Sequence, residues 1–234
     1  MTEVKKAPSG SSLKSLFKVA ISRFALAFLV LGVMFFLPAG TINYWEAWVY
    51  LLVLFVPVAL MVRYLFKHDP ELLERRMRFR ETQKTQKMVV AFSWLSFLPS
   101  FILPGFDKRF HWSNVPPPVI IIADVLVLLG YLIVALVFKA NSYASRIVEV
   151  EKGQKVISTG PYAFVRHPMY SGMVILYSFS PLALGSYWAV IPALLIIPLL
   201  VARINGEEEE LKANLEGYRE YMAKTKYRLV PGVW

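Results

Sequence analysis

Six apolar segments constrain the fold of this chain more than any other feature of its sequence. They cover residues 24–38, 47–66, 88–104, 119–138, 169–184 and 187–202. A helix needs roughly 20 mostly apolar residues to cross a bilayer, and these segments reach or approach that length. At 56% hydrophobic residues, the chain is also too apolar for a water-soluble domain of 234 residues. The sequence therefore predicts an all-α, polytopic transmembrane helical bundle.

The number of spans depends on how the last two apolar segments are divided. Pro181, Gly185 and Ser186 interrupt one long apolar stretch and favour a tight turn between two short helices. A helical hairpin at this point gives six spans. A single tilted helix with a re-entrant piece gives five, so the prediction is five to six.

Basic residues beside the apolar segments predict the orientation, because positively charged loops stay in the cytoplasm. They precede the first segment and separate the second from the third and the fourth from the fifth: Lys5, Lys6, Lys14, Lys18, Arg23, Arg75, Arg76, Arg78, Arg80, Lys84, Lys87, Arg146, Lys152, Lys155 and Arg166. The connections on the other side carry only Lys108 and Arg109. Both termini are therefore expected in the cytoplasm, and with no cleavable signal pattern the first span is expected to remain in the protein.

The net charge of +10 would indicate nucleic acid as a partner for a soluble protein. Here the basic residues gather at span ends, which is typical of anchoring in membrane lipids, and no nucleic-acid partner is expected. The chain has no cysteine, which excludes disulfides, thiolate nucleophiles and Cys-ligated zinc, and no metal site is predicted. Nothing in the sequence fixes an oligomeric state.

Three further segments carry structural expectations. Asp124 lies inside the fourth apolar segment near its outer end, which favours a solvated or hydrogen-bonded structural carboxylate over a functional one. Residues 71–87 fit either a helix on the cytoplasmic surface or a solvated loop. Leu211, Leu215, Tyr218 and Met222 recur at helical spacing and predict a cytoplasmic C-terminal amphipathic helix, and Trp234 fits an interfacial anchor.

The first polar cluster precedes the fifth apolar segment and reads G-P-Y-x-x-x-R-H-P-x-Y, from Gly160 to Tyr170. Gly-Pro favours a turn, and Pro168 is suited to the first position of a helix because its missing N–H would have no partner there. Arg166 and His167 are then expected at the mouth of that helix. Its N-terminus is suited to bind a carboxylate or a phosphate.

The second polar cluster follows the sixth segment and reads R-x-x-x-E-E-x-x-L, from Arg203 to Leu211. On a continuous helix Arg203 and Glu207 share a face, whereas Glu208 is turned about 100° away. If the last two segments form a hairpin, both clusters lie at the same end of the bundle. We therefore expect Arg, His and Glu side chains around one pocket.

These clusters, followed by G-Y-x-x-Y at Gly217–Tyr221 and R-L-x-P at Arg228–Pro231, resemble the integral membrane methyltransferases that include isoprenylcysteine carboxyl methyltransferases and phospholipid methyltransferases. The resemblance covers about the last 95 residues. It implies S-adenosylmethionine as cofactor, bound at the cytoplasmic ends of the last spans. It also implies a division into N-terminal transmembrane helices, 1–140, and a catalytic, cofactor-binding region, 141–234.

Carried onto this chain, the resemblance implies a set of cofactor-binding residues: Gln154, Tyr162, Arg166, His167, Tyr170, Glu207 and Glu208. Arg203 is the candidate for orienting an anionic acceptor, and Glu207 or His167 is the candidate base for an amine or hydroxyl acceptor. The acceptor is expected to be lipid-like, prenylated or otherwise apolar. The motifs do not identify it further.

Membrane sterol and enoyl reductases, which bind NADPH, carry a similar R-H-P-x-Y followed by an acidic pair. They typically have Asn after the proline and Trp before the late tyrosine, where this chain has Met169 and Glu220. The methyltransferase interpretation is therefore preferred. A reductase and a non-enzymatic membrane protein stay as the alternatives.

Overall fold

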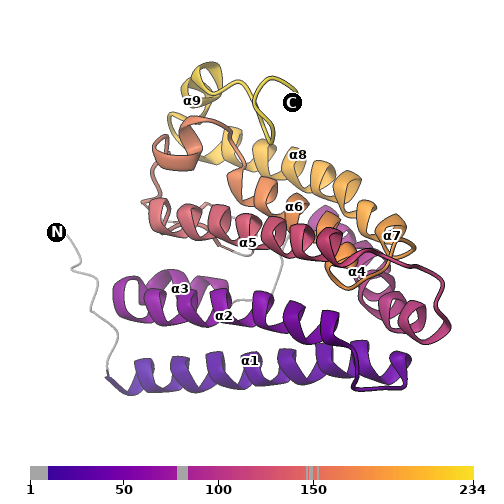
Figure 1. The fold of residues 1–234 in the computed structure, drawn as a ribbon. Helices are drawn as coiled ribbons and strands as arrows, with labels where there is room; N and C mark the ends of the chain where they lie inside the picture. The colour runs from indigo at the N-terminus through magenta and orange to yellow at the C-terminus, as the bar shows by residue number, and fades with distance from the viewer. Residues whose placement is uncertain (1–9, 78–83, 146, 148–149, 152) are drawn as a thin grey trace.

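The computed structural model describes residues 10–77, 84–145, 147, 150–151 and 153–234. Within these residues the regular structure is entirely helical (Figure 1). The elements are α1 (Gly10–Ala39), α2 (Trp45–His68), α3 (Pro70–Arg76), α4 (Lys84–Phe110), α5 (Pro117–Ala140), the 3₁₀ turn η1 (Gly160–Ala163), α6 (Pro168–Ala183), α7 (Val190–Leu194), α8 (Ile196–Asn214) and α9 (Tyr218–Lys224). The all-α prediction is confirmed.

Five segments of the described chain are long and apolar enough to cross a membrane: Ser15–Ala39, Trp45–His68, Gln86–Phe110, Pro117–Ala140 and Val190–Asn214. The chain is therefore an integral, multi-pass membrane protein. α6 has 16 residues and extends about 24 Å, which is less than the roughly 30 Å of a hydrocarbon core. By length the span count is five, and α6 forms the predicted hairpin with α7 and α8 without reaching full spanning length.

The outward faces of these helices are apolar, as expected for helices that contact lipid. Large apolar side chains on α1, α2, α4 and α5 are exposed, among them Leu29, Leu52, Leu60, Leu95 and Ile122. A surface of this kind is stable against lipid tails and would aggregate in water.

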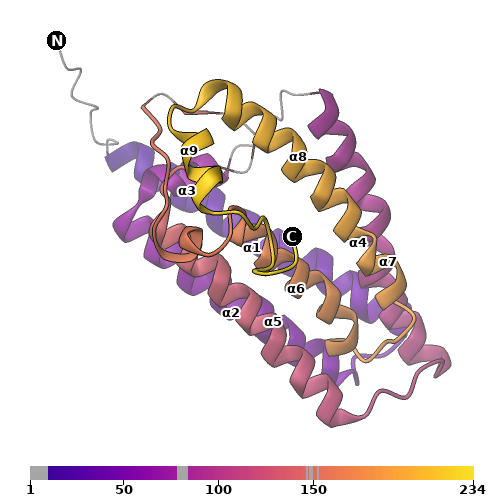
Figure 2. The same cartoon turned by 90° about the horizontal axis from the view of Figure 1, so that it is seen from above.

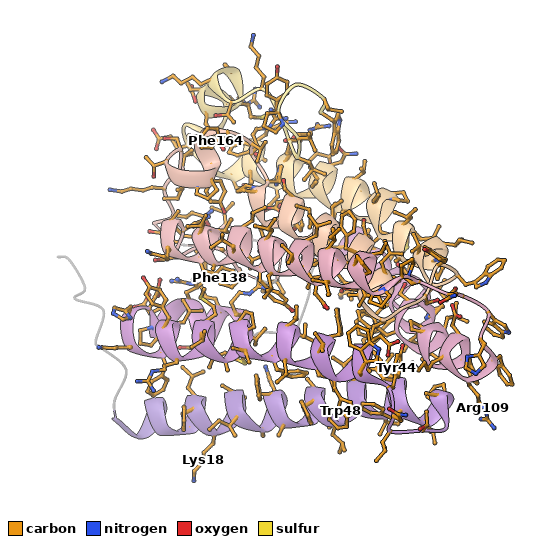
Figure 3. All side chains as sticks on the ribbon, in the orientation of Figure 1. Lys18, Tyr44, Trp48, Arg109, Phe138 and Phe164 are labelled. Atoms are coloured by element: carbon orange, nitrogen blue, oxygen red, sulfur yellow. The ribbon has the colours of Figure 1, made fainter. Side chains whose placement is uncertain are left out.

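The helices stack side by side with their long axes roughly aligned, as Figures 1 and 2 show. α1 and α2 form one layer, α5 and α6 the next, and α8 the outermost, with α4 closing the side next to α1 and α8. We call the end with α3, η1 and α9 the site end and the opposite one the far end. In Figure 3, Phe138 and Phe164 lie toward the site end, and Tyr44 and Arg109 lie toward the far end.

A polar network holds the helix connections together at the far end. Asp107, at 1% exposure, accepts hydrogen bonds from the backbone N–H and the hydroxyl of Ser113 (both 2.6 Å) and from the Ser186 hydroxyl (2.5 Å). Lys108 pairs with Glu46 at 3.0 Å, and the Tyr44 hydroxyl donates to the Leu184 carbonyl. These bonds link α2 and α4 to the turn after α6, so they fix the hairpin at the end opposite the polar side chains of the two motifs.

The closest helix contact joins α5 to α6 through a pair of glycines. A Cβ on Gly130 would lie 2.9 Å from the Gly172 carbonyl oxygen, and one on Gly172 would lie 2.8 Å from the Gly130 carbonyl oxygen. Small residues let helix backbones approach closely in membranes, where packing replaces the hydrophobic effect. This contact sets the position of α6, whose first turn carries His167 and Tyr170 into the site.

Replacing Gly130 by valine is expected to lower the free energy of unfolding by about 1–3 kcal/mol, because the branched side chain must push α6 away. Gly32→Val is the matched control, since a Cβ at Gly32 on α1 meets nothing within 4 Å. Thermal unfolding in detergent measures both variants. Equal stability of the two would contradict the packing role of Gly130.

Three local expectations differ from the structure. Residues 71–87, expected as either a surface helix or a solvated loop, contain the helix α3, Pro70–Arg76; residues 78–83 lie outside the described chain, and Lys84 already belongs to α4. The C-terminal amphipathic helix is wrong as one element, because α8 ends at Asn214 and α9 begins at Tyr218. Gly217 between them has φ +81°, a left-handed conformation that a helix cannot contain.

Asp124 is the third difference. Its side chain is buried, and neither carboxylate oxygen has a hydrogen-bond partner within the described residues. The expectation of a solvated or hydrogen-bonded carboxylate is therefore wrong. The reason is rotational: Asp124 lies on the inward face of α5 beside Ala123 and Val127, which are also buried, and not on its outer face.

The cytoplasmic placement of the termini stays a prediction. Several of the basic residues behind it lie outside the described chain, namely Lys5, Lys6, Arg78, Arg80, Arg146 and Lys152. Trp234, the expected interfacial anchor, packs its ring under the Arg228 guanidinium at 4.9 Å and joins the cluster around Leu229 and Ile204. It thereby contributes to packing at the site end.

Candidate functional site

A cavity opens at the site end between α6, α8, α9 and the segment that links α5 to η1. Its lining combines aromatic, cationic and anionic side chains with a few apolar ones. The lining residues are Asn141, Tyr143, Ala144, Ser145, Ile147, Gln154, Lys155, Val156, Ile157, Tyr162, Arg166, His167, Met169, Tyr170, Arg203, Glu207, Glu210, Leu211, Leu215, Tyr218 and Tyr221. This cavity contains the side chains of both polar motifs, so the predicted convergence of the two clusters is confirmed.

The C-terminal segment holds the first motif in place. The backbone N–H groups of Arg166 and His167 donate to the carbonyls of Tyr227 and Arg228, both at 2.9 Å, and the Ser171 hydroxyl donates to the Leu229 carbonyl at 2.7 Å. Pro168 occupies the first turn of α6, as predicted. The N–H groups of Arg166 and His167 are therefore already hydrogen-bonded within the protein.

Glu208 is the centre of a buried charge cluster behind the cavity wall. Its side chain is fully buried, and its Oε1 accepts from Arg166 Nε at 2.8 Å and lies 3.2 Å from His167 Nε2. Its Oε2 accepts from Arg228 at 2.8 Å. Arg166 also donates to the carbonyls of Thr225 and Lys226. This cluster joins α8, α6 and the C-terminal segment into one rigid wall.

A second set of contacts faces the cavity. The Tyr170 hydroxyl donates to Glu207 Oε2 at 2.6 Å and accepts from Arg203 Nε at 3.1 Å. His167 Nδ1 lies 3.9 Å from the other oxygen of Glu207. Arg203 and Glu207 share a face of α8, as the spacing predicted, while Glu208 points away from the cavity toward Arg166 and Arg228. The cavity thus contains a cationic side chain, Arg203, and an anionic side chain, Glu207, which both hydrogen-bond to the Tyr170 hydroxyl.

Aromatic side chains close the cavity on the side of η1 and α9. The Tyr162 hydroxyl accepts from the Asn141 amide at 2.9 Å, and the Tyr221 hydroxyl donates to the Tyr162 carbonyl at 2.8 Å. Burial raises the pKa of Tyr162 well above its ordinary value and that of Tyr221 to about 12. Both phenols are therefore neutral at physiological pH and are available as hydrogen-bonding groups.

Tyr218 is exceptional among the lining residues. Its side chain is 4% exposed, and its hydroxyl has no hydrogen-bond partner within the described residues. Burial raises the pKa of the Tyr218 phenol, with a further contribution from the Glu208 carboxylate, so the hydroxyl keeps its proton. Leaving a buried hydroxyl unpaired costs free energy, so this tyrosine stands out among the residues that line the cavity.

The segment between α5 and η1 is held over the cavity by α3. Arg75 is buried, donates to the Ser142 carbonyl at 2.6 Å and lies 3.4 Å from the Glu151 carboxylate. The Gln154 amide oxygen accepts from the Glu151 backbone N–H at 2.9 Å. Gln154 therefore reaches the cavity as part of a fixed turn, and Arg75 connects that turn to the N-terminal half of the protein.

The structure places the sequence-predicted residues as follows. Gln154, Tyr162, Arg166, His167, Tyr170, Arg203 and Glu207 line the cavity, whereas Glu208 does not, because its carboxylate is enclosed by Arg166, His167 and Arg228. Sequence reasoning did not single out Tyr143 and Met169 as lining residues, and it assigned Tyr218 to helix packing. Only the G-Y-x-x-Y motif pointed toward Tyr218.

No group of three or more His, Cys, Asp or Glu side chains that could hold a metal ion occurs among the described residues. The cavity lining combines charged and aromatic side chains. Arg203 and Glu207 come from α8, further polar groups such as Gln154 come from the segment between α5 and η1, and tyrosines come from that segment, η1, α6 and α9. Such a lining can hold a zwitterionic or cationic nucleoside-like molecule.

Residues 119–213 match the model of the isoprenylcysteine carboxyl methyltransferase (ICMT) family. The match covers less than half of the chain, from the start of α5 to the end of α8, and includes both polar motifs. No curated protein matches the chain. The match confirms the resemblance expected from the motifs, and together with the five apolar helices it supports a membrane methyltransferase.

Proposed function

We propose that this chain, which resembles the isoprenylcysteine carboxyl methyltransferases from α5 to α8, is an integral membrane methyltransferase that uses S-adenosylmethionine. The observation that carries the proposal is the single cavity lined by both polar motifs. We further propose that residues 141–234 form the cofactor-binding region and that the site end faces the cytoplasm. Lys155, Arg166 and Arg203 at the cavity support that orientation.

The lining fits the chemical groups of the proposed cosubstrate. S-adenosylmethionine has an aromatic base, two ribose hydroxyls, an amine, a carboxylate and a sulfonium. The cavity offers tyrosines for the base, carboxylates for hydroxyls or the amine, and cations for the carboxylate. The unpaired Tyr218 hydroxyl supplies a donor for a ring nitrogen or a ribose oxygen. A pocket with a purely structural role would not need a buried donor that has no hydrogen-bond partner among the described residues.

We assign binding roles to the side chains that line the cavity. His167 and Glu207 would hold the charged methionyl end, and Gln154, Tyr162 and Tyr218 would hold the nucleoside end. Tyr170 fixes Glu207 by a 2.6 Å hydrogen bond. Glu208 and Arg166 keep the wall rigid through their 2.8 Å ion pair, so their contribution to binding is indirect.

When bound, the cosubstrate supplies an electrophilic methyl group. The protein then has to position the acceptor in line with that methyl group and exclude water, which accounts for most of the catalysis in a displacement of this kind. Arg203 would orient an anionic, lipid-like or prenylated acceptor by pairing with its carboxylate. A carboxylate needs no base, whereas an amine or hydroxyl acceptor would transfer its proton to Glu207 or His167.

Calorimetry on the purified protein tests the cosubstrate. S-adenosylhomocysteine is expected to bind, and NADPH is not. In Tyr218→Phe the dissociation constant of S-adenosylhomocysteine should rise about tenfold, because one hydrogen bond is lost. The thermal stability of the free protein should not fall, since the hydroxyl has no hydrogen-bond partner within the described part of the chain.

Tyr187→Phe is the matched control, because Tyr187 is exposed and lies beyond the far end of α6. It should bind S-adenosylhomocysteine as the wild type does. Selective NADPH binding would replace the methyltransferase with a reductase. Binding of neither S-adenosylhomocysteine nor NADPH would indicate a non-enzymatic membrane protein.

A further inference from the structure

Gln86 is a fully buried amide in the first turn of α4, outside both polar motifs. Its side chain contacts one residue of the site twice. The Gln86 nitrogen donates to the Arg203 carbonyl at 3.3 Å, and the Gln86 oxygen accepts from Arg203 Nη1 at 3.3 Å. An amide carries both a donor and an acceptor, so it can hold the backbone and the guanidinium of the same arginine.

Gly206 makes this contact possible. A Cβ at Gly206 would overlap the Gln86 side-chain nitrogen, so the amide packs directly on the glycine of α8. Gly206 lies on the same face of α8 as Arg203, three residues further on. α4 and α8 can therefore approach closely at this point, because a glutamine on α4 packs against a glycine on α8.

Arg203 is held from two sides. Gln86 on α4 contacts its Nη1, and Tyr170 on α6 accepts from its Nε at 3.1 Å. The Tyr170 proton goes to Glu207. The resulting row, Gln86, Arg203, Tyr170 and Glu207, runs across three helices and ends in the cavity. An arginine fixed at two nitrogens loses its rotational freedom before a ligand arrives, which reduces the entropy cost of binding.

We propose that Gln86 is a positioning residue that holds the Arg203 guanidinium in the direction of the anionic group of the acceptor. This inference rests on the proposed function, because it assigns Arg203 to the acceptor. It adds a residue from the N-terminal half of the chain, outside the part that matches the family model. Gln86 contacts neither acceptor nor cosubstrate in this role and acts only through Arg203.

The test compares an acid with its uncharged ester. N-acetyl-S-farnesylcysteine and its methyl ester serve as probes, because they differ in the one negative charge that Arg203 would recognise. Binding of each is measured in detergent by ligand-induced thermal shift or calorimetry, without turnover. The wild type should prefer the acid roughly tenfold, and Gln86→Met should reduce this preference to about twofold or less. Affinity for S-adenosylhomocysteine should stay within about twofold.

Two further variants separate positioning from helix packing. Ser96→Ala removes another buried hydrogen bond of α4, from the Ser96 hydroxyl to the Pro192 carbonyl at 2.7 Å, and should lower thermal stability while keeping the acid preference. Gly206→Ala favours the helix but displaces the Gln86 amide. It should lose the acid preference, and its thermal stability should fall as well, because the displaced amide loses its two hydrogen bonds to Arg203.

The outcomes distinguish this inference from the proposed function. If the wild type binds S-adenosylhomocysteine and prefers the acid, and Gln86→Met and Gly206→Ala keep the same preference for the acid as the wild type, the positioning role of Gln86 is wrong. The proposed function then stands. If the wild type does not prefer the acid, the anionic acceptor is wrong, and the inference falls with it. Loss of preference in both variants but not in Ser96→Ala supports the inference.

Discussion

Glu208→Ala is expected to lower the free energy of unfolding by about 3–5 kcal/mol, the largest stability change among the variants considered. The carboxylate is fully buried and accepts from Arg166, His167 and Arg228. Its removal leaves Arg166, which is itself buried, without its anionic partner. A buried unpaired charge is among the most costly defects in a folded protein.

Chemical unfolding in detergent, followed by far-ultraviolet circular dichroism, measures this change. Glu209→Ala is the matched control, since Glu209 is the next residue of α8 and is exposed. It should change the unfolding free energy by less than about 0.5 kcal/mol. A Glu208 variant as stable as the Glu209 variant would show that the charge cluster does not hold the C-terminal segment to α6.

Arg203→Met is expected to lower the rate of methyl transfer about a hundredfold or more, the largest change in activity. Removing one charged group that orients a reacting anion typically costs a factor of 10²–10³. Methionine keeps the length and apolar volume of the side chain, so the packing of α8 is retained. Because Arg203 is assigned to the acceptor, affinity for S-adenosylhomocysteine should change by no more than about twofold.

The rate is measured as transfer of a labelled methyl group to N-acetyl-S-farnesylcysteine. Arg109→Met serves as the matched control, because Arg109 is an exposed arginine at the far end of α4. Its rate should equal that of the wild type. If Arg203→Met also keeps the full rate while binding S-adenosylhomocysteine, then Arg203 does not orient the acceptor.

The elements that the sequence predicted correctly are those determined by neighbouring residues in the chain. Apolar segments of near-spanning length predicted the membrane helices, because the thickness of a bilayer sets their length. Pro168 and the interruption around Gly185 predicted where α6 begins and where the hairpin turns. The hairpin in turn predicted that Arg166 and His167 lie close to Glu207 and Glu208. The structure confirms this, with 2.8 Å between Arg166 Nε and Glu208 Oε1.

The sequence did not separate the two adjacent glutamates by role. Their spacing predicted that Glu207 and Glu208 point in different directions, but both were expected to bind cofactor. The structure places Glu207 at the cavity and encloses Glu208 behind its wall. The difference depends on Arg228, twenty residues further along, and on the path of the C-terminal segment that carries it.

By itself, then, the sequence determined that the chain crosses a membrane as a helical bundle and that its polar motifs converge at one end, since helix length, turns and helical spacing are local properties. Only the tertiary structure decided that Gln86 contacts Arg203, that Tyr218 lines the cavity with its hydroxyl buried and unpaired among the described residues, and that Asp124 is buried. These contacts join segments far apart in the chain. They depend on how closely and at what rotation the helices pack, and no spacing within one segment encodes that.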